Sequence, residues 1–251
     1  MALEAIPNRK AYQENEWGGI EHQPFKSYFQ HFKDWCGDSY GIFRTVQFTE
    51  KTLKLVAQYP GNSMADACEN VAGECGKFMG VLGLFDLPGD TEKGVKALSS
   101  RPNGMRDVVK RIENLTNAVT TWGYARLLIG NDPVVKTVVG YADVVGNCTK
   151  LGLNAFDSHR AYNEAKGYDH MPAVKERLTA TARHAFLKTV AATVSVSLAA
   201  LGAIAVIFGG PVLPAAALIT LGLVGTITHI YAAFYKATRP WKMVDADEYA
   251  V

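Results

Sequence analysis

The 251-residue sequence lacks the short motifs that mark common enzyme and nucleotide-binding sites. Residues 73–77 have neither the spacing of a phosphate-binding loop nor the Ser or Thr that follows its lysine. Asp157, Ser158 and His159 are the residue types of a catalytic triad, but three consecutive residues of a helix point in different directions. We therefore assign no catalytic, cofactor-binding or metal-ligating residue, and we interpret the protein as a non-enzyme without a cofactor.

Cysteines and clustered charges are also scarce. The four cysteines form no CxxC pair and no zinc-type spacing with histidine, and Cys68 and Cys75 share one helix face, so we expect reduced, buried side chains. The formal net charge is only +2 and no Lys/Arg-rich block occurs, which gives no reason to expect a nucleic-acid partner. The N-terminal segment is too rich in charged residues to contain the apolar region of a signal peptide.

Two long runs near the C-terminus contain no Asp, Glu, Lys or Arg. They cover residues 189–208 and 212–235, and Gly209, Gly210 and Pro211 separate them. A helix needs roughly twenty apolar residues to cross the hydrocarbon core of a bilayer. Glycine can end a helix and proline cannot continue one. The pattern predicts a transmembrane helical hairpin, so a lipid bilayer is the expected partner of residues 189–235.

Basic residues lie at the open end of this predicted hairpin. Arg183, His184 and Lys188 precede the first run, Lys236 follows the second, and the connecting turn is uncharged. Because positive charge is retained on the cytoplasmic side of a membrane, we expect both termini in the cytosol and only the turn to cross. His229 lies about two turns before Lys236 and is expected near the interface.

The chain before the hairpin has the spacing of amphipathic helices. Apolar or small residues recur at steps of three and four in three stretches, and we expect these stripes to form the core of a bundle of four or five antiparallel helices. Their members are Cys68, Val71, Cys75, Phe78 and Leu82, then Val108, Ile112, Leu115, Val119 and Trp122, and last Val134, Val138, Tyr141, Val145, Cys148, Gly152 and Ala155.

Turn and cap signals predict the helix boundaries. Helices are expected over residues 43–59, 63–84 and 105–129, and the sequence Leu87-Pro88-Gly89-Asp90 is expected to break the chain after the second of them. Asp132 followed by Pro133 is a start signal for the next helix. Pro172 then opens a last amphipathic segment, which runs directly into the first apolar run.

The expected fold class is all-α, an antiparallel helical bundle followed by a C-terminal transmembrane helical hairpin. The predicted organisation is a weakly patterned N-terminal segment (1–41), a helical bundle domain (42–186), the hairpin (187–236) and a polar C-terminal tail (237–251).

Two further surfaces stand out. An aromatic stripe in the N-terminal segment is expected to dock on the body of the protein; it consists of Phe25, Tyr28, Phe29, Phe32 and Trp35. Small residues on the hairpin permit close helix approach and hence a homo-oligomer. These are Ser195, Ala199 and Ala203 on the first helix and Thr220, Gly222 and Gly225 on the second.

The paired run, residues 189–208 and 212–235 split by Gly209-Gly210-Pro211, resembles the bilobed segment of chlamydial inclusion membrane proteins. The resemblance covers about a fifth of the chain and is one of hydropathy shape rather than of a residue motif. It implies type III secretion into the vacuole membrane around a bacterium, with a soluble part that faces the host cytosol and recruits host proteins. One departure is that the first Ser or Thr is Ser27, whereas secreted effectors often begin with a Ser/Thr-rich segment.

A hydrophobic hairpin surrounded by amphipathic helices also looks like a colicin-type pore-forming domain, in which the hairpin inserts into a target membrane. A further similarity is to peroxisomal membrane-elongation proteins, although residues 63–84 and 105–129 lack the dense Lys/Arg face of strong interfacial binders. The leading hypothesis is a non-enzymatic, membrane-anchored effector whose cytosolic helices bind an unidentified protein, and the alternative is a pore-forming protein.

Overall fold

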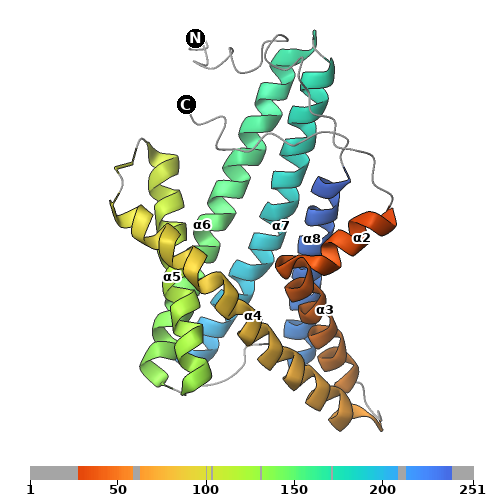
Figure 1. Ribbon diagram of the computed structural model, residues 1–251, viewed down its shortest axis with the longest axis vertical. Coiled ribbons are helices and arrows are strands. Elements are labelled where there is room, and N and C mark those ends of the chain that lie inside the picture. Colours follow the sequence, from red (N-terminus) through yellow and green to blue (C-terminus); the bar gives the residue numbers. More distant parts are fainter. Residues whose placement is uncertain are drawn as a thin grey trace.

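The computed structural model describes residues 28–58, 63–99, 101–102, 104–130, 132–170, 172–208 and 213–238. These residues are almost entirely helical and contain no strand, so the all-α class is confirmed for them (Figure 1). The elements are α2 (Tyr28–Gly37), α3 (Ser39–Ala57), α4 (Ala65–Ser99), α5 (Met105–Ile129), α6 (Pro133–Ala165), the 3-10 turn η2 (Lys166–Tyr168), α7 (Pro172–Phe208) and α8 (Ala215–Ala237).

Local sequence signals account for several helix boundaries. Asp132 precedes α6, and its Oδ1 accepts hydrogen bonds from the backbone N–H groups of Val134 (3.0 Å) and Val135 (3.4 Å). This cap satisfies donors that have no partner inside the first helical turn. α7 continues without interruption from the segment after Pro172 to Phe208, as expected from the sequence. The amphipathic segment and the first apolar run are therefore one helix.

The predicted break around Pro88 is wrong. α4 passes through Pro88 as one continuous helix, although an internal proline removes a backbone hydrogen bond. Two contacts with α5 hold the next turn in place. Thr121 Oγ1 donates to Asp90 Oδ2 (2.8 Å), and Trp122 Nε1 donates to Thr91 Oγ1 (2.9 Å). Packing between α4 and α5 thus opposes the local preference for a break at Pro88. These contacts between helices cannot be read from the sequence of α4.

The helices from α3 to α8 form a ring. Each of them packs against the next along the chain, and α8 returns to pack against α3 (Figure 1). α6 and α7 make a long helical hairpin along the long axis of the molecule, and α4 crosses obliquely to it. This arrangement gives α3, α5, α6, α7 and α8 a shared interior, which side chains from all five helices line.

α5 and α6 are joined by a close crossing and by an ion pair. Gly123 of α5 lies so near α6 that a Cβ atom there would be 1.9 Å from Val139 Cγ2. The crossing therefore requires glycine, which has no Cβ atom. Arg106 donates from Nε to Asp157 Oδ1 and from Nη2 to Asp157 Oδ2, both at 3.1 Å, and each side chain is only 16% exposed. A bidentate pair of this kind fixes the register of the two helices.

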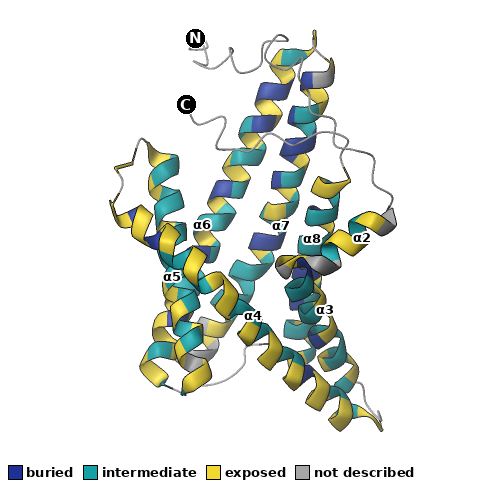
Figure 2. Cartoon of the chain, in the orientation of Figure 1, coloured by how far each residue is buried: buried dark blue, intermediate teal, exposed yellow. Residues whose placement is uncertain are grey.

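The apolar stripes of α5 and α6 face outward, contrary to the expectation from the sequence (Figure 2). The expected core assignment is wrong for these residues because periodicity locates an apolar face but does not say what that face meets. On α4 the stripe is mixed, with Val71 and Phe78 exposed and Cys68 and Cys75 half-buried. The exposed members on α5 and α6, here called the outer stripe, are Val108, Ile112, Val119, Trp122, Val134, Val138, Tyr141, Val145, Cys148, Gly152 and Ala155.

Small side chains form most of the core instead. Alanines dominate the buried apolar residues, and Leu178 is the largest side chain that is fully buried in the described part of the chain. Cys68, Cys75 and Cys148 are free thiols, and none of the three is fully buried, so the expectation of buried cysteines is wrong for them. A core of small residues brings helix backbones close together but buries little apolar area per helix.

α7 and α8 contain the two segments that are long and apolar enough to cross a membrane, Val174–Gly202 and Ala215–Ala237. Only 17% and 22% of their most apolar windows are buried within the molecule. Where the helices meet, a Cβ atom on Gly225 would lie 2.9 Å from Val194 Cγ1 of α7. Gly222 faces Lys51 of α3 instead. The described helices therefore bury few residues of this apolar pair completely, and many of the others are half-buried.

The aromatic stripe of the N-terminal segment is described in part. The Trp35 ring of α2 lies 5.1 Å from the Phe234 ring of α8, and its Nε1 donates to Thr45 Oγ1 of α3 (3.0 Å). Trp35 therefore docks on the body, as expected. Phe25, the other residues before Tyr28, the hairpin turn at 209–212 and the tail beyond residue 238 lie outside the described residues.

Candidate functional site

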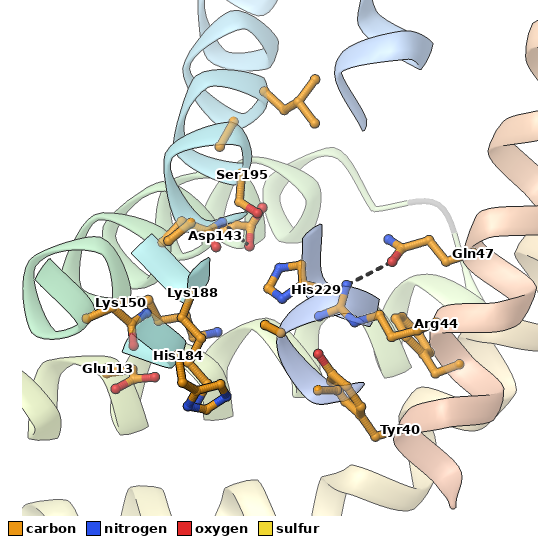
Figure 3. A pocket seen from close by; sticks show the side chains of 18 of the residues that line it. Tyr40, Arg44, Gln47, Glu113, Asp143, Lys150, His184, Lys188, Ser195 and His229 are labelled. Carbon is orange, nitrogen blue, oxygen red and sulfur yellow. Dashed lines mark hydrogen bonds between the residues drawn. The ribbon is translucent and has the colours of Figure 1, made fainter. Parts of the chain in front are cut away.

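A cavity of about 860 Å³ lies within the ring, and α3, α5, α6, α7 and α8 all contribute to its lining. Small-molecule sites in proteins commonly have volumes of about 300–1,000 Å³. The charged and histidine side chains that line this basic cavity are Arg44, Glu113, Asp143, Lys150, His184, Lys188, His229 and Lys236. Figure 3 labels all of these residues except Lys236 and shows them around a common space, with Lys150, Lys188 and His184 on one side, Arg44 on the other and His229 between.

Cations outnumber carboxylates in this lining. Four side chains are basic and only Glu113 and Asp143 are acidic. Arg44, Lys150 and Lys188 all lie within electrostatic range of the His229 ring, although they come from three different helices. Like charges gathered in a partly desolvated space repel one another more strongly than in water. The arrangement therefore favours the entry of an anion.

Arg44 is held in position by its neighbours. Its Nη1 donates to Gln47 Oε1 (2.8 Å), and its guanidinium carbon lies 5.0 Å from the centre of the Tyr40 ring and 5.7 Å from that of Phe43. Its Nε is buried and has no hydrogen-bond partner among the described residues. A buried donor without a partner costs free energy.

Asp143 of α6 is one of the two carboxylates that line the cavity, and it is half-buried. Burial raises the pKa of Asp143, while the nearby Lys150 charge and a hydrogen bond from Asn147 Nδ2 (3.0 Å) act in the opposite direction. The net rise reflects loss of contact with water, which disfavours the charged form of a carboxyl group. Asp143 is therefore a weaker counter-charge for the surrounding cations than an exposed aspartate would be.

The polar lining and the outer stripe occupy opposite faces of the same helices. On α6, the cavity residues Asp143, Asn147, Lys150 and Asn154 recur at steps of four, three and four, which places them on one helix face. The outer stripe on α6 follows the same spacing on the other side. The spacing of these polar residues on α6 can be read from the sequence. Their proximity to His184, Lys188 and Lys236 depends on the ring formed by α3 to α8.

The triad-like residues do not come together. Asp157 binds Arg106 of α5, Ser158 Oγ donates to the backbone oxygen of Ala182 (3.0 Å), and the exposed His159 contacts Asn163 (2.8 Å). Each of the three points to a different neighbour, as helix geometry requires. Among the described residues, no three His, Cys, Asp or Glu side chains gather in a way that could hold a metal ion.

Comparisons with protein families, with curated proteins and with solved structures found no match to this chain. The arguments for function therefore depend on three features of the molecule itself. These are the apolar pair α7–α8, the outer stripe and the basic cavity.

Proposed function

We propose that this is a membrane-anchored helical protein without enzymatic activity, in which residues 189–235 cross the bilayer as a hairpin. Both termini lie in the cytosol, and the remaining helices bind a partner protein there. The observation that supports the proposal is the small share of fully buried residues in the apolar pair, 17% and 22% of the two most apolar windows. Apolar surface exposed to water costs about 25 cal/mol per Å², and lipid removes this cost. The core helices of a soluble protein would be mostly covered.

The outer stripe is the surface proposed for the protein partner. Monomeric proteins rarely leave large contiguous apolar patches in water, and such patches commonly mark interaction sites. Trp122 and Tyr141 are 55% and 63% exposed, and aromatic residues are enriched at the centres of protein interfaces. The resemblance to inclusion membrane proteins extends the proposal to a secreted effector in a vacuole membrane that recruits a host protein.

Alkaline carbonate extraction tests the anchor. The full chain is expected in the membrane pellet, because a spanning hairpin resists conditions that release peripheral proteins. A variant without residues 187–236 is expected in the supernatant as a folded helical fragment, measured by circular dichroism and cooperative thermal unfolding. A full chain found in the supernatant as a monomer would contradict the proposal.

Pore formation is a second candidate, and one observation favours it. A polar cavity inside the ring and an apolar stripe outside it match the distribution in membrane channels, where charged side chains line the passage and apolar ones face lipid. In this case α5 and α6 would enter the bilayer beside the hairpin. Conductance across planar bilayers measures this directly. Discrete current steps from the full chain would support a pore, and a silent bilayer that still contains the protein would support an anchor.

A further inference from the structure

We propose that the basic cavity binds a phosphate group, carried by the headgroup of an anionic lipid or by a soluble phosphate ester. The location of the site at a membrane surface rests on the proposed hairpin. The charge, volume and geometry of the site do not, because they follow from the described helices alone.

The charge balance calls for an anion of about two negative charges. With Arg44, Lys150, Lys188 and Lys236 positive and two carboxylates negative, the lining has a formal charge of +2 when both histidines are neutral. A phosphate monoester carries about −1.5 to −2 near neutral pH. Its binding would offset the repulsion among the cations, which stand on α3, α6, α7 and α8 and therefore meet only in the folded ring.

Arg44 has the donor geometry for a phosphate. The contacts with Gln47, Tyr40 and Phe43 restrict the guanidinium before any ligand arrives. A restricted planar donor group binds phosphate oxygens with less loss of conformational freedom than a mobile side chain.

The position of the cavity fits the headgroup region. Lys188 directly precedes the first apolar run and Lys236 directly follows the second, so both lie at the base of the proposed hairpin. Lipid phosphates lie at this level of a bilayer, and basic pockets between membrane helices on the cytoplasmic side bind anionic headgroups. Apolar lining residues such as Leu198 lie further along α7, on the side where acyl chains would enter.

Binding is measured on the full chain purified in a maltoside detergent without phosphate. Isothermal titration calorimetry with inorganic phosphate and glycerol phosphate tests the soluble source. Native mass spectrometry with phosphatidic acid, compared with phosphatidylcholine, tests the headgroup. Binding of either phosphate source supports the site, and the arm that responds more strongly identifies the source. Failure of inorganic phosphate, glycerol phosphate and phosphatidic acid to bind would overturn it.

Three variants test the residues. Arg44→Gln and Lys150→Gln are each expected to weaken binding about tenfold or more, because each removes a charged hydrogen-bond donor from the cavity. Arg44→Lys keeps the charge but loses the planar fork, so an intermediate loss is expected. Lys77→Gln on α4 removes the same charge from a side chain that is 75% exposed, and it should leave affinity unchanged. Equal weakening by Lys77→Gln would mean non-specific attraction and would overturn the site.

Folding and anchoring are checked separately. Circular dichroism and thermal unfolding must match the unaltered chain for each variant, and Arg44→Lys keeps the test valid if Arg44→Gln fails to fold. Carbonate extraction is run on the same preparations. A chain that leaves the membrane but binds phosphate through Arg44 would contradict the anchor and keep the site. A chain that stays in the membrane and binds no phosphate would contradict the site alone.

Discussion

The α7–α8 pair and the α5–α6 pair both present apolar side chains on the outside of the molecule, but they differ in how many charged residues they carry on their other faces. The apolar run of α7 and most of α8 carry no Asp, Glu, Lys or Arg. α5 and α6 have an apolar outer stripe and, on the opposite face, the carboxylate and lysine side chains of the basic cavity. Composition alone points the first pair towards lipid. For the second pair, composition allows water, lipid or a protein partner outside.

The difference shows what amphipathic periodicity means. A repeat of three and four residues establishes that a helix has two unlike faces. In a water-soluble bundle the apolar face turns inward, and around an aqueous cavity in lipid it turns outward. The same repeat on α5 and α6 therefore fits both architectures, and only the positions of neighbouring helices distinguish them.

The largest effect is expected from a charge in the hairpin. Val224 of α8 and Val145 of α6 are the same residue type with 46% and 44% exposure, so they form a matched pair. Val224→Arg is expected to oppose insertion by about 3 kcal/mol, because an arginine near the centre of a spanning helix is costly. We expect Val224→Arg to shift the protein into the carbonate supernatant and Val145→Arg to leave it in the pellet. Release by both variants would indicate that α6 also lies in the bilayer.

A smaller loss is expected from Arg106→Ala at the α5–α6 junction. This change leaves Asp157 without its bidentate partner at a site that is 16% exposed. Removing one member of a fully buried pair costs about 3–5 kcal/mol, and partial contact with water should reduce this to about 2–3 kcal/mol. Chemical denaturation of the fragment without residues 187–236 measures the change. Lys77→Ala, which breaks the exposed pair with Glu74, is the control and should alter stability by less than about 1 kcal/mol.

Glycine replacements test the close approach of the same two helices. Gly123→Ala places a methyl group against Val139 and should destabilise the fragment by about 1–2 kcal/mol through overpacking. Gly140→Ala of α6 meets no atom within 4 Å, so it should instead stabilise the helix by about 0.5–1 kcal/mol. Denaturation midpoints measure both changes in stability. A loss for Gly123→Ala and a gain for Gly140→Ala would support a close crossing of α5 and α6 at Gly123. Two stabilising replacements would show that α5 and α6 do not cross at Gly123.

The smallest effect is expected from Asp143→Asn. Because burial raises the pKa of Asp143, the folded chain holds this proton to higher pH than the unfolded chain does. Ionisation therefore lowers stability as pH rises from the ordinary carboxyl range through the folded pKa. The asparagine variant should melt slightly higher at neutral pH, and the difference should close below about pH 4. Glu74→Gln, at a side chain that is 72% exposed, controls for loss of one negative charge. A melting difference independent of pH would contradict the assignment.

Much of the secondary structure was predictable, because it depends on neighbours in the chain. The Asp132 cap, the helix from 105 to 129 and the continuous helix from Pro172 into the first apolar run all follow from local signals. The continuation of α4 through Pro88 did not follow from local signals, because the hydrogen bonds that hold the next turn come from Thr121 and Trp122 of α5. No window of the α4 sequence contains those partners.

The sequence by itself determined that this protein is helical and that two of its helices have the length and composition to cross a membrane, because capping, periodicity and hydropathy act over a few neighbouring residues. Only the tertiary structure decided that the stripes of α5 and α6 face outward and that Arg44, Lys150, Lys188 and Lys236 share one cavity. The first and last of these cations are almost two hundred residues apart. Their proximity depends on the return of α8 to α3, which closes the ring.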